Sequence, residues 1–192
     1  MSPRRLRCSI GLLLLPAFSA CGPVPQPESL RTVAAYEVPL TAAGDREVLE
    51  ALLRRDAGAD GFHLDASTAE ELKWQSGVSP ISINATVWRG KDDDEPVASV
   101  MDGPDHLGLA WLTFSLSDEP ARTARFRDRV MKRIVQRWPN TATLPITPSG
   151  GIPLRGDLVL TGRAYRVKRQ AASTYGFPAS SPFLTDALPI SR

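Results

Sequence analysis

The sequence has little that could build a disulfide framework, a metal cluster or a membrane bundle. Its 192 residues include two cysteines, Cys8 and Cys21, which excludes multi-bridge scaffolds and multi-cysteine zinc sites. The one long apolar run, residues 10–18, is shorter than the roughly 20 residues that a membrane-spanning helix needs. A polytopic membrane protein is therefore excluded. The chain as a whole, with 42% hydrophobic and 23% charged residues, has the composition of an ordinary globular domain.

The first 20 residues have the order of an export signal. Three arginines and no acid lie within residues 1–7, the apolar run follows, and the small residues Ser19 and Ala20 come after it. This charged, apolar and then small-residue order is typical of a secretory signal peptide. Pro16 inside the run disfavours the alternative, an N-terminal core helix. We expect residues 1–20 to form a signal peptide.

The end of this segment, Phe18-Ser19-Ala20-Cys21, resembles the lipobox of bacterial lipoproteins, with Phe18 where leucine is usual. The resemblance implies that Cys21 is diacylated and becomes the first residue of the mature chain. In this family Gly22, in place of aspartate, is compatible with sorting to the outer membrane. The resemblance therefore implies a lipid-anchored protein of the cell envelope, on the periplasmic face of the outer membrane.

A tether is expected between the anchor and the folded domain. Residues 22–30 alternate proline with polar residues, a composition that favours an extended and semi-rigid chain. Residues 21–30 therefore comprise the lipidated cysteine and a Pro-rich tether. Two acyl chains give stable membrane association, whereas one chain gives only marginal binding. The expected partner of the N-terminus is the membrane itself.

Residue periodicity predicts one α+β domain over residues 31–170. Apolar spacing indicates a helix over residues 42–56 capped by Thr41, and a longer helix over residues 120–138 that begins at a proline and stops before one. A capping box at residues 67–70 predicts a short helix to about residue 76. Strand patterns predict strands at residues 62–64, 81–88, 96–101 and 107–116, and a hairpin across 158–168.

This order of elements predicts an α+β fold, an antiparallel sheet of three to five strands with two main helices packed on one face. Residues 41–138 are expected to form the stable unit. Residues 171–192 are expected to be a flexible C-terminal tail, because from 176 onward the sequence alternates proline, serine and alanine with few apolar anchors.

The helix expected over residues 120–138 has two contrasting faces. Basic residues fill one half of the helical wheel. The other half is filled by the apolar residues Phe126, Val130, Met131, Ile134, Val135 and Trp138. Arg127 is a misfit within the apolar half and is expected to extend past the sheet edge. The basic face is either a solvated surface or a contact for an anionic partner, such as lipid headgroups, a wall polymer or an acidic protein. The candidate partner-binding or anion-binding residues are Arg122, Arg125, Arg129, Lys132 and Arg133.

Charge is divided along the chain. Residues 31–117 carry a net charge of −8, and residues 118–192 carry +8. The two parts should attract each other, although exposed pairs contribute only about 0–1 kcal/mol each. Without residues 1–20 the chain has 20 basic and 21 acidic residues. A nearly neutral protein is a poor candidate for nucleic-acid binding, so no such partner is expected.

The sequence identifies no reaction. It contains no Gly-x-Ser-x-Gly elbow, no His-Glu-x-x-His motif and no phosphate loop, and it predicts no cofactor. The acidic run 92–95 is interpreted as a solvated hairpin tip, because consecutive acids lack the alternating spacing of an EF-hand. Only two histidines are present, His63 and His106, with Asp65 and Asp105 nearby in the sequence.

Three hypotheses on function follow. The first is a non-enzymatic binding, assembly or scaffold lipoprotein that presents the helix at 120–138 and a sheet edge to an envelope protein or an anionic polymer. The alternative is an envelope hydrolase or modifying enzyme that uses His63 or His106 with a nearby carboxylate. The third is a purely structural outer-membrane lipoprotein. The sequence does not set the oligomeric state.

Overall fold

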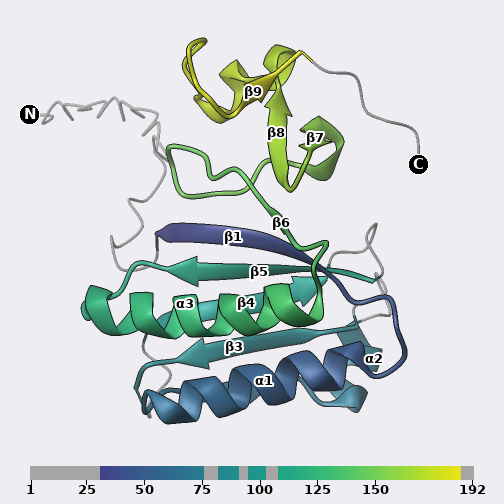
Figure 1. Cartoon of the computed structure of the whole chain (residues 1–192), viewed down its shortest axis with the longest axis vertical. Coiled ribbons are helices and arrows are strands. Elements are labelled where there is room, and N and C mark those ends of the chain that lie inside the picture. Colours follow the sequence, from purple (N-terminus) through teal and green to yellow (C-terminus); the bar gives the residue numbers. More distant parts are fainter. Residues whose placement is uncertain (1–30, 76–81, 91–94, 103–107, 187–192) are drawn as a thin grey trace, which may run out of the picture.

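A computed structural model describes residues 31–75, 82–90, 95–102 and 108–186. Its helices and strands follow one another along the chain as shown in Figure 1. The elements are β1 (Thr32–Pro39), α1 (Asp45–Ala59), β2 (His63–Ala66), α2 (Ala69–Gln75), β3 (Asn84–Trp88), β4 (Pro96–Asp102), β5 (Leu109–Ser115), α3 (Pro120–Arg137), β6 (Ala142–Thr143), β7 (Leu158–Thr161), β8 (Ala164–Lys168) and β9 (Leu184–Thr185), with the 3₁₀ helices η2 (Arg155–Asp157), η3 (Arg169–Ala171) and η4 (Ser173–Tyr175).

Within the described residues the strands form one mixed sheet of nine strands in the order β2-β3-β4-β5-β1-β6-β8-β7, with β9 beside β8. The pairs β6–β8 and β8–β9 are parallel, and the other pairs are antiparallel. The expected antiparallel sheet of three to five strands with two main helices is therefore wrong. The sheet is larger because the chain returns after α3 and adds further strands beyond β1. The hairpin expected across residues 158–168 is present as β7 and β8.

Three strands, β1, β6 and β9, were not predicted from the sequence, and each has a physical reason. β1 contains the adjacent residues Ala34 and Ala35 and ends at Pro39, so its alternation of apolar and polar residues is weak. β6 and β9 have only two residues each. Such short strands are specified by the neighbouring strand that they pair with, and not by a pattern of their own.

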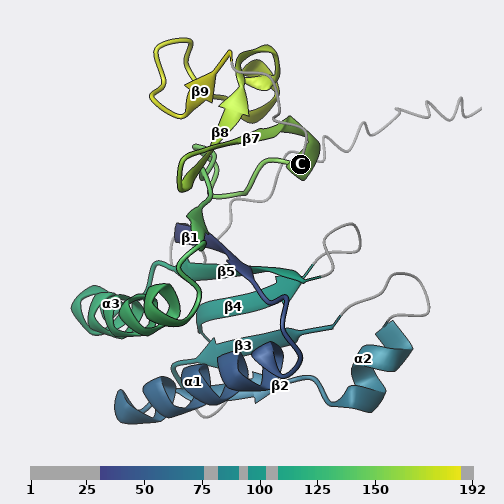
Figure 2. The same cartoon turned by 45° about the vertical axis from the view of Figure 1, so that its right-hand side comes forward.

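The main core lies between the sheet and the helices α1 and α3, which cover one of its faces (Figure 1; Figure 2). The expected apolar stripe of α3 is confirmed for Phe126, Val130 and Ile134, which are fully buried. The Phe126 ring meets the Phe114 ring of β5 edge to face, with 6.1 Å between centroids. Val135, expected in the same stripe, is instead exposed. Burial of this stripe fixes α3 against the sheet.

The predicted N-terminal caps of α1 and α2 differ from the observed ones. The residue that precedes α1 is Gly44, with a φ of 82°, and not Thr41. The Asp45 carboxylate accepts a hydrogen bond from the Ala42 N–H at 2.9 Å, which closes the turn before the helix. The capping box of α2 is displaced by one residue from the expected position. The Thr68 hydroxyl and backbone N–H both donate hydrogen bonds to the Glu71 carboxylate, at 2.9 and 2.7 Å. The Glu71 N–H in turn donates to the Thr68 hydroxyl.

The chain after α3 forms a C-terminal module, residues 142–186, with a core of its own above the sheet (Figure 2). This core includes Ala35 of β1, and Trp111 of β5 packs against it. Both side chains lie on the sheet face opposite the helices, because strand residues alternate between faces. Phe177 and Leu184 are buried in the same core. Residues 171–186, which belong to the expected flexible tail 171–192, therefore have defined contacts. Residues 187–192 lie outside the described part of the chain. The mobility of the tail stays a prediction.

Candidate functional site

Several residues chosen from the sequence lie outside the described part of the chain. They include Cys21, His106 and the acidic run up to residue 94. Lipidation at Cys21 and a hydrolase that uses His106 therefore stay predictions. Across the ranges that the structure describes, no helix combines the length and apolar character required to cross a membrane.

The basic face of α3 is turned partly toward the acidic helix α1. The guanidinium groups of Arg129 and Arg133 approach the Asp56 carboxylate, at 3.7 and 3.4 Å. Arg129 also donates to the Asp56 carbonyl at 2.9 Å and forms an ion pair with Asp60. Asp56 is buried, whereas the two arginine side chains are 33% and 39% exposed. These arginines neutralise a buried acid and connect the two helices.

Arg122, the first residue of the predicted set, is also held within the chain. Its Nε donates to the Asp60 carbonyl at 2.8 Å, and its Nη1 lies 3.0 Å from a carboxylate oxygen of Glu119. The guanidinium carbon is 4.6 Å from the centre of the Phe62 ring, a cation–π contact. The hydrogen bond from Arg122 holds the pKa of the Glu119 carboxyl below its ordinary value. Arg122 therefore joins the start of α3 to the end of α1.

The other two residues of the set face solvent. Arg125 and Lys132 are exposed, and neither forms an ion pair with any residue in the described ranges. The misfit Arg127 is half-buried and contacts its neighbour Asp128, with 3.0 Å between Nη2 and Oδ1. Of the five predicted residues, the structure therefore brings three toward α1 and leaves two available on the surface.

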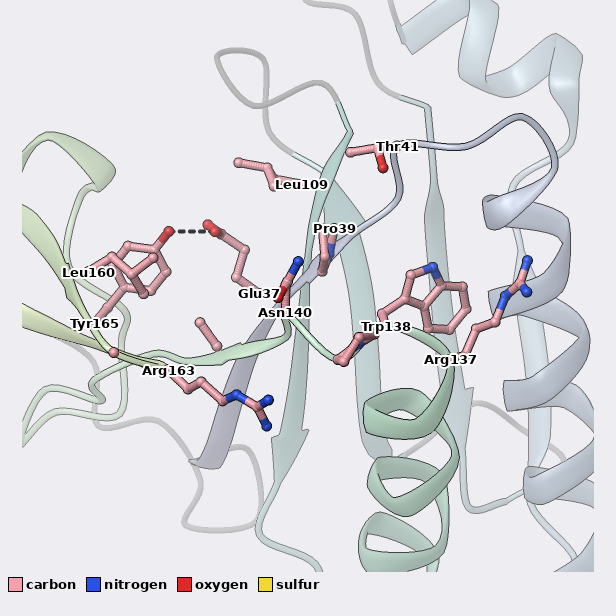
Figure 3. Close-up of a pocket in the computed structure, with 13 residues that line it drawn as sticks. Glu37, Pro39, Thr41, Leu109, Arg137, Trp138, Asn140, Leu160, Arg163 and Tyr165 are labelled. Carbon is pink, nitrogen blue, oxygen red and sulfur yellow. Dashed lines mark hydrogen bonds between the residues drawn. The ribbon is translucent and has the colours of Figure 1, made fainter. Parts of the chain in front are cut away.

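A cleft of about 620 Å³, the junction cleft, lies between β1, the end of α3 and the turn from β7 to β8 (Figure 3). Its wall contains both polar and apolar side chains. Figure 3 shows Glu37 and Tyr165 pointing toward each other across the junction with the C-terminal module. The residues that line the cleft are Glu37, Pro39, Thr41, Leu109, Arg137, Trp138, Pro139, Asn140, Ala142, Leu160, Gly162, Arg163 and Tyr165.

Glu37 is the central residue of this junction, and sequence reasoning missed it. One carboxylate oxygen accepts a hydrogen bond from the Tyr165 hydroxyl at 2.6 Å. The other accepts from the Trp111 indole at 3.2 Å and from the Arg155 guanidinium. Arg155 also lies over the Tyr165 ring, 4.5 Å from its centre. Glu37 thus holds the C-terminal module on the sheet; the signal for it was an acid within the otherwise apolar β1.

The remaining buried carboxylates are bonded within the chain as well. Asp102 accepts the backbone N–H groups of Ser82 and Ile83 at 2.8 and 3.1 Å, and the Ser82 hydroxyl. Glu95 pairs with Arg89. These bonds secure the start of β3 and the connection before α3. Buried carboxylates that accept several hydrogen bonds contribute to structure.

The histidine and carboxylate groups of the described ranges do not form a metal-binding cluster. No cluster of three or more histidine, cysteine, aspartate or glutamate side chains that could hold a metal occurs there. His63 lies in β2, directly opposite Trp88 of β3. Comparison of this chain with protein-family models, with curated proteins and with solved structures finds no match. Any function must therefore be inferred from the sequence and geometry of the chain itself.

Proposed function

We propose that this chain is a membrane-anchored lipoprotein of the cell envelope, on the periplasmic face of the outer membrane, and that it acts as a non-enzymatic binding, assembly or scaffold factor. The observation that carries the non-enzymatic part of the proposal is the bonding of the buried carboxylates. Glu37 and Asp102 accept hydrogen bonds from groups of this same chain, and Asp56 is paired with Arg129 and Arg133. A general base needs a lone pair within reach of a substrate proton. Carboxylates that are engaged by groups of the same chain instead stabilise the fold and keep its surface fixed.

The proposed recognition surface is the basic face of α3. Arg122, Arg129 and Arg133 form its inner edge along α1, and Arg125 and Lys132 form its outer row. A partner can reach the outer row without breaking an ion pair described above. An acidic envelope protein or an anionic polymer has the complementary charge. Charges of this kind mainly set the rate of association and its dependence on salt.

The experiment compares two double variants in the full-length, envelope-expressed protein. Arg125→Gln with Lys132→Gln removes the outer row. Arg54→Gln with Lys73→Gln removes the same charge from exposed positions on α1 and α2. Recovery of the bound partner from solubilised envelopes should fall several-fold for the first variant only, and the fall should shrink at high salt.

Equal recovery for both variants and for the wild type would contradict the proposed surface. An equal loss in both variants would assign the effect to net charge and not to α3. A measured thermal midpoint for each variant excludes unfolding as the cause.

A further inference from the structure

We propose that the end of the domain where the tether enters rests on the bilayer, with an apolar groove beside β1 contacting the headgroup and acyl boundary. This inference rests on the proposed lipid anchor at Cys21. It adds a defined orientation, because the anchor alone would leave the domain free to rotate. The occupant of the groove is the surface of the membrane that carries the anchor.

The groove, about 480 Å³ in volume, lies between the start of β1 and the C-terminal module. Ile146 and Phe177 are part of its wall, and Val33 and Phe183 line it while remaining 42% and 46% exposed. The Phe183 ring packs against the Phe177 ring with 6.1 Å between centroids. Val33 and Phe183 therefore line the groove and remain open to solvent. Exposed apolar groups arranged in this way are typical of a contact surface.

The position of the groove specifies the membrane as its occupant. Arg31, the first described residue, is part of the groove wall, and its guanidinium donates to the Pro148 carbonyl at 3.3 Å. Cys21 lies ten residues earlier, so even a fully extended chain keeps Arg31 within about 35 Å of the anchor. A short tether raises the effective concentration of the groove at the membrane into the millimolar range. A weak apolar contact then suffices to hold the domain.

The charge of the surrounding module fits the same occupant. Residues 142–186 contain five basic and two acidic residues, a net charge of +3. Basic groups close to a membrane are attracted by anionic lipids within about one Debye length. An apolar rim within a basic module is the arrangement expected of an interfacial contact.

The test uses the cysteine content of the mature chain. Cys21 is its only cysteine, and acylation blocks that sulfur, so one introduced cysteine gives one labelling site. Val33→Cys and Ser181→Cys place a fluorescent label at the groove. Val48→Cys is the matched control, because Val48 is also 42% exposed but lies on α1. The lipidated proteins are reconstituted in phosphatidylethanolamine vesicles that contain phosphatidylglycerol and a nitroxide-labelled lipid.

The two groove labels should be quenched by the nitroxide lipid at least three-fold more strongly than the label at Val48. Adding Phe183→Ser should reduce the quenching at Val33→Cys toward that of the control. Equal quenching at all three sites would overturn the orientation. Labels at Val33 and Ser181 that are shielded from both the lipid and an aqueous quencher would also overturn it, since a protein segment would then fill the groove.

The proposed function fails in a different way. Without acylation, Cys21 would take up a second label and the protein would not float with the vesicles, which refutes the anchor and with it the inference. Flotation with single labelling but equal quenching refutes the orientation alone.

Discussion

Replacing Arg129 and Arg133 with glutamine removes the two guanidinium groups of α3 that face the Asp56 carboxylate. Asp56 is buried, with a relative exposure of 1%. Removing the partner of a buried charge generally costs about 3–5 kcal/mol. Here both arginines are about one third exposed, and Arg55 stays 3.6 Å from the carboxylate. Solvent screening and this remaining cation reduce the expected loss to about 2 kcal/mol.

A loss of this size is measurable by thermal unfolding. For a chain of this length about 1 kcal/mol corresponds to 2–4 °C, so the midpoint should fall by about 4–8 °C. The matched variant, Arg125→Gln with Lys132→Gln, changes two exposed residues of the same helix and should stay within about 0.5 kcal/mol of the wild type. Circular dichroism at a fixed ionic strength compares the two variants directly.

Adding Asp56→Asn to the Arg129→Gln and Arg133→Gln variant supplies the control for mechanism. It removes the isolated charge, so part of the lost stability should return. Equal midpoints for the inner and outer double variants would refute the assignment of Arg129 and Arg133 to an intramolecular pair. A lack of rescue by Asp56→Asn would show that the loss has another origin.

Three further predictions concern the junction and α2. Glu37→Gln should lower the free energy of unfolding by about 3 kcal/mol, because it leaves the Arg155 cation without its carboxylate. Tyr165→Phe should lower it by about 1.5–3 kcal/mol, the contribution of one hydrogen bond to a charged group. Urea unfolding measures both values, and an unchanged stability of Glu37→Gln would contradict the network. Hydrogen bonds from Thr68 hold the pKa of the Glu71 carboxyl below its ordinary value of 4.5. These bonds therefore stabilise the folded state fully above pH 4.5, and their contribution is lost as the pH falls through the lower pKa of Glu71 in the folded state. Thr68→Ala should raise the Glu71 pKa in an NMR titration, and an unchanged value would contradict the capping box.

Much of the helical layer was predictable from local sequence. In α3, Phe126, Val130 and Ile134 recur at helical spacing after Pro120, and the observed helix, Pro120–Arg137, ends one residue before the predicted end. The expected sheet was too small because β1 has a weak alternating pattern and because β6 and β9 depend on their neighbours. Periodicity describes one element at a time, so it gives little information on a strand that is specified by pairing.

The candidate site was predictable only in part for a similar reason. The helical wheel placed Arg122, Arg129 and Arg133 opposite the apolar stripe, but it could not show that the acidic helix α1 lies beside them. The opposite charges of the two parts of the chain were the available signal. The acid Glu37 could be seen within an apolar stretch, but its partners could not be predicted, because Trp111 and Tyr165 are 74 and 128 residues away in the sequence.

The most direct test of the central claim is the intact mass of the mature protein purified from the envelope, with fragmentation of its N-terminal peptide. The proposal predicts a chain that begins at Cys21 and carries acyl groups on that residue. It also predicts that Cys21→Ser abolishes both processing and membrane association. An unmodified N-terminus at another residue, or a Cys21→Ser protein that is still processed and membrane-bound, would contradict a lipid-anchored envelope protein.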